Sequence, residues 1–190
     1  MEKNIALIGN SDLAKAFSKT YSHHNYTWFV RPDYDITEKD DCDKLIKNLQ
    51  HKDVVLITSG AITSDVWQSM LTNAVGPIYL VSELVKLDCQ PHVIVVGSLG
   101  AEWRSWPGIN LERLIYNNSK HMLSNFVKDF YHSQLNNCKL TVLEPGRFQS
   151  TMSDFTGAEI DNIVHMINYA IEASEDFTVL NVQGAWHKRG

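Results

Sequence analysis

Residues 4–15 read NIALIGNSDLAK, and this stretch sets the fold that the rest of the chain continues. Asn4 to Ile8 is a short apolar run of the kind that forms a buried strand, and it ends at Gly9. Ser11 stands where a helix N-cap is expected, and Leu13 and Phe17 follow at helical spacing. The stretch therefore predicts a strand, a tight turn and a helix.

A second β-rich run, Tyr26 to Val30, completes a strand–helix–strand unit and stops at Arg31-Pro32. Such a unit predicts a parallel sheet with helices on both faces. Further strands are expected at residues 34–36, 53–58, 92–98, 140–143 and 177–182, and helices at residues 42–49, 63–86, 110–131 and 158–173. Gly76-Pro77 is expected to bend or split the long helix. The sequence predicts an α/β protein with a doubly wound parallel sheet of about seven strands.

Composition and charge narrow the classes of partner. The chain has 190 residues, 44% of them hydrophobic, which suits one domain over residues 1–190. The net charge is −5, and scattered Lys and Arg give no electrostatic footprint for nucleic acid or an anionic membrane. The three cysteines and eight histidines lack metal-ligand spacing, and no apolar segment approaches the length that spans a bilayer. We expect a cytoplasmic protein with no metal, no nucleic acid and no membrane partner.

A candidate for proton chemistry lies on the helix at residues 110–131. Tyr116 and Lys120 are four residues apart, so they share a helix face with Cβ atoms about 5–6 Å apart. A nearby cation favours the phenolate form of a tyrosine and makes it a usable proton donor. Ser98 ends the strongest strand pattern of the chain, where ligands of open parallel sheets bind. Taken alone, the helix pair also fits two exposed side chains.

The order of these motifs resembles the short-chain dehydrogenase/reductase family from near the first residue to Gly184. The resemblance implies a three-layer αβα Rossmann fold and a catalytic tetrad of Asn73, Ser98, Tyr116 and Lys120. Supporting matches are Asp65-Val66-Trp67 before Asn73, Gly76 after it, Glu144-Pro145-Gly146 with Thr151, and residues 180–184. By resemblance, Ser98 binds the substrate oxygen and Tyr116 transfers the proton. Lys120 lowers the tyrosine pKa and holds the nicotinamide ribose, and Asn73 anchors a water.

The resemblance also implies a nicotinamide dinucleotide, although only Gly9 of the family's three turn glycines is kept. Arg31 directly follows the second strand and suits a 2′-phosphate, so NADP(H) is favoured, with NAD(H) as the other option. A solvent-facing arginine is the alternative reading of Arg31. Asp35-Ile36-Thr37 is similar to the adenine-contacting segment, or forms a turn or helix cap. The expected cofactor-binding residues are Gly9, Ser11, Leu13, Arg31, Asp35, Ser59, Gly60, Lys120, Pro145, Gly146 and Thr151.

The expected substrate is a small molecule with a carbonyl or secondary alcohol group. Trp103 and Trp106 either wall its pocket or serve as core or subunit-contact aromatics. By resemblance, the helices at residues 63–86 and 110–131 make a homodimer or homotetramer. Two alternatives stay open: a catalytically silent nucleotide-binding regulatory protein, because the glycine turn is eroded, and a nucleotide-sugar reductase or epimerase, because the connection after the second strand is short.

Overall fold

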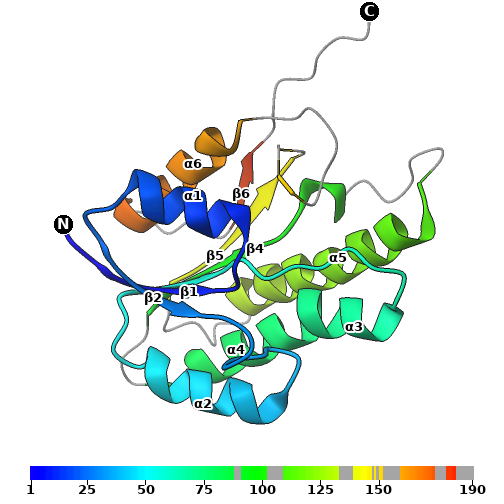
Figure 1. The fold of residues 1–190 in the computed structure, drawn as a ribbon, viewed down its shortest axis with the longest axis horizontal. Coiled ribbons are helices and arrows are strands. Elements are labelled where there is room, and N and C mark those ends of the chain that lie inside the picture. The colour runs from blue at the N-terminus through cyan, green and yellow to red at the C-terminus, as the bar shows by residue number, and fades with distance from the viewer. Residues whose placement is uncertain are drawn as a thin grey trace, which may run out of the picture.

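A single parallel sheet organises the molecule (Figure 1). The computed structural model describes residues 1–87, 91–101, 109–132, 139–146, 148, 150–151, 159–173 and 179–182. These residues hold six strands in the order β2-β1-β3-β4-β5-β6, and all five pairings are parallel. The strands are β1 (Asn4–Ile8), β2 (Asn25–Phe29), β3 (Val54–Ile57), β4 (His92–Val96), β5 (Leu140–Pro145) and β6 (Val179–Val182). The predicted parallel α/β architecture is therefore confirmed.

The predicted count of about seven strands is not confirmed, because residues 34–36 form a loop and a turn. Side-chain carboxylates accept hydrogen bonds from the backbone N–H groups that a strand would use for pairing. The N–H of Asp35 donates to Asp41 Oδ2 (3.1 Å), and the N–H of Thr37 donates to Asp35 Oδ1 (2.9 Å). Asp and Asn favour such local turns over regular pairing.

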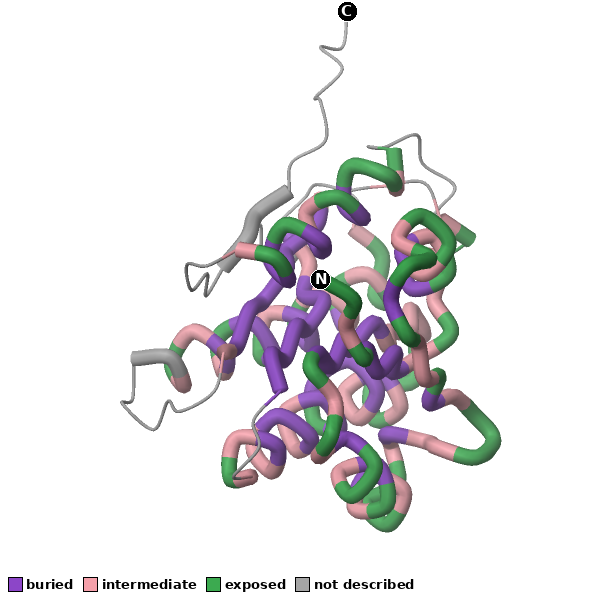
Figure 2. The backbone as a smooth tube through the Cα atoms, turned by 90° about the vertical axis from the view of Figure 1, so that its left-hand side faces the viewer, coloured by how far each residue is buried: buried purple, intermediate pink, exposed green. Residues whose placement is uncertain are grey.

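Helices cover both faces of the sheet and make three layers (Figure 1). Helices α1 (Asp12–Thr20) and α6 (Ile160–Glu172) pack on one face, and α2 (Lys39–Leu49), α4 (Gly76–Leu84) and α5 (Leu111–His132) pack on the other. Residues of β1 alternate between the two cores: Ala6 and Ile8 join one, and Ile5 and Leu7 join the other. Figure 2 shows buried residues gathered at the centre of the molecule, and β3, β4 and β5 are buried at every residue.

The sheet reverses its winding between β1 and β3, since β2 lies on the other side of β1. The turn after β1 fits closely against β3: Gly9 has φ +101°, and a Cβ there would lie 3.0 Å from the backbone nitrogen of Ser59. Only glycine takes this conformation readily. Open α/β sheets bind ligands at such a switch point, outside the carboxyl ends of the strands.

The predicted long helix changes from α- to π-helical winding just before Gly76. A short helix α3 (Val66–Met70) runs into a π-helical segment, η1 (Leu71–Val75), and α4 begins at Gly76 with Pro77 in its first turn. A Cβ on Gly76 would lie 2.2 Å from the carbonyl oxygen of Ile36, so a glycine is needed for this helix to approach that loop. Gly76 therefore allows close packing of the helix against that loop.

None of the helices in the described part of the chain is both long and apolar enough to cross a bilayer.

Candidate active site

Lys120 joins helix α5 to the carboxyl ends of two central strands. Its side chain is only 2% exposed, and its ammonium donates to the carbonyl oxygens of Ser59 (3.0 Å), after β3, and Val96 (2.8 Å), the last residue of β4. Burial lowers the pKa of Lys120 to about 7, even though two carbonyl groups accept hydrogen bonds from it. The ammonium therefore sits at the strand ends where a ligand is expected, poised to titrate near neutral pH.

Tyr116 and Ser98 come together one helical turn before Lys120. The Ser98 hydroxyl hydrogen-bonds with the phenol of Tyr116 and also accepts from the N–H of Gly100 (3.3 Å). Tyr116 is partly exposed as a residue. Burial of its phenol raises the pKa of that phenol. The charge of Arg113 and the hydrogen bond with Ser98 oppose this rise. The charge that favours the phenolate in this structure is that of Arg113, whereas Lys120 bonds the two strand-end carbonyls.

Asn73 lies in η1 and holds the loop that follows β3. Its amide nitrogen donates to the carbonyl oxygen of Ala61 (2.8 Å) and to Ser69 Oγ (2.9 Å), and its Oδ1 accepts from the N–H of Ala61 (2.7 Å). A Cβ on Gly60 would lie 3.6 Å from Asn73 Oδ1 and 3.7 Å from Lys120 Nζ. Both side chains therefore lie beside the position that a Cβ on Gly60 would take. Asn73 positions the loop beside Lys120, and a π-helical segment at such a place is common in functional sites.

The turn after β1 leads into α1, which has a side-chain N-cap. Asp12, in the first turn of this helix, contacts a residue far along the chain. Ser11 Oγ accepts from the N–H of Ala14 (3.1 Å), and Leu13 is buried in the core beneath α1. Asp12 Oδ2 accepts from the N–H (2.6 Å) and the hydroxyl (2.8 Å) of Thr151, 139 residues away. These two bonds lower the pKa of Asp12. The Asp12–Thr151 clasp, as we call this pair, joins the start of α1 to the segment after β5.

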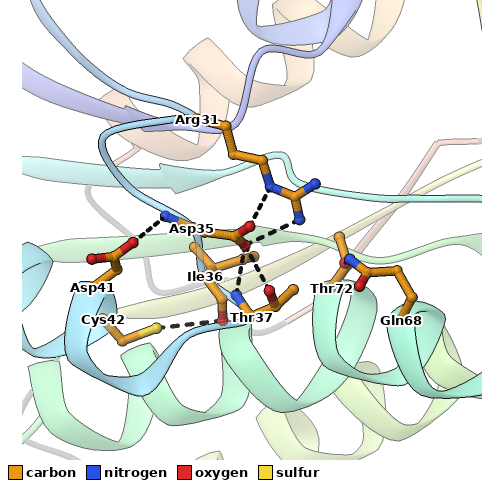
Figure 3. Close-up of polar contacts among 8 residues, drawn as sticks. All are labelled: Arg31, Asp35, Ile36, Thr37, Asp41, Cys42, Gln68 and Thr72. Carbon is orange, nitrogen blue, oxygen red and sulfur yellow. Dashed lines mark hydrogen bonds and ion pairs between the residues drawn. The ribbon is translucent and has the colours of Figure 1, made fainter.

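Arg31 and Asp35, two of the expected cofactor-binding residues, contact each other after β2 (Figure 3). Arg31 Nε lies 2.7 Å from Asp35 Oδ2, and Arg31 Nη2 donates to Asp35 Oδ1 (3.0 Å). The same Oδ1 accepts from the N–H (2.9 Å) and hydroxyl (2.8 Å) of Thr37. Figure 3 also shows Gln68 of α3, whose side-chain amide donates to Thr72 Oγ1 in η1 (3.1 Å).

The end of β5 supplies a buried acid before the expected Pro145 and Gly146. Glu144 is fully buried, and its Oε1 lies 3.2 Å from Lys128 Nζ on α5. Trp103 and Trp106 lie outside the described residues. Within those residues, no three His, Cys, Asp or Glu side chains gather as a metal site would require.

Three interactions of the site were not predicted from the sequence. Arg113 lies three residues before Tyr116, so the helix-spacing rule that selected Lys120 would also have selected it. The Glu144–Lys128 pair and the Asp12–Thr151 clasp join distant segments, and no local pattern signals either.

Comparison with known proteins identifies the fold. No family profile and no curated sequence matches the chain. Solved structures do: 3-alpha-hydroxysteroid dehydrogenase from Pseudomonas sp. B-0831, complexed with NADH, aligns with TM-score 0.77 and 14% identity over 95% of this chain and 96% of that one. A short-chain dehydrogenase from Burkholderia cenocepacia J2315, in complex with NADP, gives 0.72 and 12% over 94% and 88%. A dTDP-4-dehydrorhamnose reductase from Bacillus anthracis, in complex with NADP, gives 0.73 and 14% over 96% and 75%. The chain therefore has the Rossmann-type fold of these dehydrogenases and reductases.

Proposed function

We propose that this protein is an NAD(P)H-dependent oxidoreductase of the short-chain dehydrogenase/reductase type, acting on a small carbonyl or secondary alcohol compound. The observation that carries the proposal is the convergence of Ser98, Tyr116 and Lys120 at the carboxyl ends of β3 and β4. A buried lysine bound to two backbone carbonyls is costly to maintain, and perturbed groups of this kind cluster at functional sites.

The residues at the switch point fit a nicotinamide dinucleotide. The turn at Gly9 lets backbone approach closely, and the N-terminus of α1 offers N–H groups to phosphates. Ser59 Oγ is buried beside this turn and, within the part of the chain the structure describes, has no hydrogen-bond partner, so it can serve a ligand. Arg31 favours NADP(H), with NAD(H) as the second option. When bound, the nicotinamide would supply or accept the hydride.

The side chains of the site bind the substrate oxygen and supply the proton that this oxygen takes up. In the reducing direction, Ser98 donates a hydrogen bond to the substrate oxygen as negative charge develops there. Tyr116 then gives its phenolic proton to that oxygen, a general-acid step worth about 10²–10⁴-fold. The charges of Arg113 and, by resemblance, Lys120 stabilise the phenolate that remains. Asn73 keeps the loop after β3 in place beside Lys120.

The test begins with cofactor binding and then removes one hydroxyl. A thermal-shift titration with NADPH and NADH identifies the cofactor, and a panel of aldehydes and ketones then provides a turnover assay. Tyr116→Phe is expected to abolish turnover while leaving cofactor affinity near that of the unaltered protein. Tyr79→Phe is the matched control, because Tyr79 donates to Asp43 on α2, away from the site. Near-normal turnover by Tyr116→Phe would rule out the mechanism.

A regulatory, catalytically silent nucleotide-binding protein is the second candidate, and the Asp12–Thr151 clasp favours it. Its carboxylate lies in the first turn of α1, where a dinucleotide pyrophosphate would otherwise be received, and like charges repel. Failure of both NADPH and NADH to raise the melting temperature would favour this candidate.

We also propose that the protein forms a homodimer or homotetramer through α3, η1 and α5, which pack beside one another. Large apolar side chains are exposed on these elements: Val66, Trp67, Val75, Leu111, Leu114 and Met122. Exposed apolar side chains on neighbouring helices favour a protein contact there, since apolar patches on a surface mark such contacts. Sedimentation velocity gives the oligomeric state directly, and a monomer at micromolar concentration would refute the assignment.

A further inference from the structure

His24 is buried at the amino ends of β1 and β2, at the opposite edge of the sheet from the candidate active site. It directly precedes β2 and is only 5% exposed. Its Nδ1 accepts a hydrogen bond from the backbone N–H of Lys3 (3.3 Å), and its ring centroid lies 4.0 Å from that of His23. Helices α1 and α6 pack side by side (Figure 1), and the hydroxyl of Tyr21, after α1, hydrogen-bonds with Nδ1 of His165 on α6 (2.7 Å). We call this cluster of His23, His24 and His165 the histidine junction.

The backbone partner of His24 fixes which nitrogen of the imidazole carries the proton. Because a backbone N–H only donates, Nδ1 accepts as the unprotonated nitrogen, and the proton of the neutral ring lies on Nε2. A protonated imidazole donates from both nitrogens. Protonation of His24 would therefore direct an N–H of the ring at the N–H of Lys3 and remove the hydrogen bond between them.

A charge on His24 would also place a cation in the protein interior. Burial is the main reason why the pKa of His24 lies below its usual value, and the charges of His23 and of the N-terminal amino group of Met1 lower this pKa further. The side chain of Asn168 and the charge of Glu172, both on α6, raise the pKa without offsetting burial. His24 is therefore neutral at neutral pH. Other titratable side chains at the junction are Tyr21, Tyr26 and His165.

The contact between Tyr21 and His165 does not require a neutral ring. A hydroxyl both donates and accepts hydrogen bonds, so Tyr21 can bond Nδ1 of His165 in either protonation state of that ring. The N–H of Lys3 can only donate. Of these two contacts of the histidine junction, the one made by His24 is therefore the one that acid breaks.

We propose that His24 is a pH-sensitive switch, whose neutral ring ties the start of β1 to β2 and α6 and whose protonation in mild acid opens the histidine junction locally. The centre of the sheet stays folded, because β3 and β4 are buried at every residue. An unfolded histidine has a pKa of about 6.5, above that of buried His24, so the open junction binds more protons. The equilibrium constant for opening should therefore rise as the pH falls below about 6.5, by up to about tenfold per pH unit. This inference does not depend on the proposed function.

Hydrogen exchange of the backbone amides, followed by NMR on the full chain at about pH 7.5, 6.5 and 5.5, measures this opening. After correction for intrinsic exchange rates, protection in β2 and α6 should fall by up to about tenfold between the last two pH values, whereas protection in β4 should not. His24→Asn keeps a side-chain oxygen that can accept from Lys3 and does not titrate, so it should remove the fall. His51→Gln is the matched control, because His51 is exposed after α2, and it should behave as the unaltered protein does.

No fall in the unaltered protein, or an equal fall in His24→Asn, would overturn the proposal. So would a loss of protection in β4 together with β2 and α6, because that result describes global unfolding. His24→Gln gives the same comparison if His24→Asn does not fold. The Cε1 proton resonance of His24 reports its titration independently: we expect an inflection below about pH 6.5, and one at or above that pH would contradict the switch.

Discussion

Replacing Asp12 with alanine tests whether the Asp12–Thr151 clasp opposes the binding of a dinucleotide. Asp12 lies in the first turn of α1, and both of its short bonds go to Thr151. A pyrophosphate received at this helix terminus carries about two negative charges. At about 6 Å in water, its repulsion by one carboxylate amounts to about 1.4 kcal/mol, and physiological salt reduces this to about half. We expect Asp12→Ala to bind NADPH about three- to tenfold more tightly.

Fluorescence titration with NADPH at low and physiological salt measures this effect, and the gain should be larger at low salt. The variant also loses a favourable charge at a helix N-terminus, which costs about 0.3–1 kcal/mol of stability. Asp161→Ala is the control, because Asp161 is the first-turn acid of α6 and its removal changes the net charge equally. An affinity that is equal to or weaker than that of the unaltered protein, with Asp161→Ala unaffected, would show that the clasp does not oppose binding.

Three further predictions concern stability and assembly. The pKa of Lys120 is about 7 in the folded protein and about 10.4 in an unfolded chain, so the unfolded chain binds more protons between these values. The free energy of unfolding should therefore rise with pH over this range, by up to about 1.4 kcal/mol per unit, and urea titrations of Lys120→Met should lack this slope. Gly76→Ala should lower the urea midpoint, because its Cβ would clash with the Ile36 carbonyl, costing about 1–3 kcal/mol; an unchanged midpoint would contradict the clash. Trp67→Glu should shift the sedimentation of the assembly towards that of the monomer, since Trp67 is 75% exposed on the proposed contact face.

The architecture could be predicted because its strands carry strong local patterns. Residues 93–96 form a continuous apolar run that is buried throughout, as a strand covered on both faces requires. Helix α1 is likewise predicted by local features, namely the capping serine before it and the spacing of Leu13 and Phe17. Residues 34–36 misled the prediction because their β-type side chains lie in a turn fixed by carboxylates, which a pattern of hydrophobicity does not record.

The candidate site was predictable as a set of residues but not as a set of contacts. Spacing indicated that Tyr116 and Lys120 share a helix face, but the carbonyl oxygens that hold Lys120 come from two other strand ends. Likewise, the sequence marked Asn73 without indicating that its amide bonds the backbone of Ala61. Arg31 and Asp35 were each assigned to the cofactor, and their mutual contact appears only when the turn between them is built. Long-range backbone acceptors leave no periodic trace in a sequence.

The π-helical segment η1 has a consequence for changes in chain length. Each residue of an α-helix advances the rotation by about 100°, so inserting or deleting one residue turns everything beyond it to a different direction. Asn73 must face Ala61 while Gly76, three residues later, must face Ile36. The π-helical turn lets both residues face their partners within one continuous helix. A single-residue deletion between Leu71 and Val75 would restore regular α-helical winding and break one of the two contacts. Conservative substitutions there would leave unchanged the directions in which Asn73 and Gly76 face.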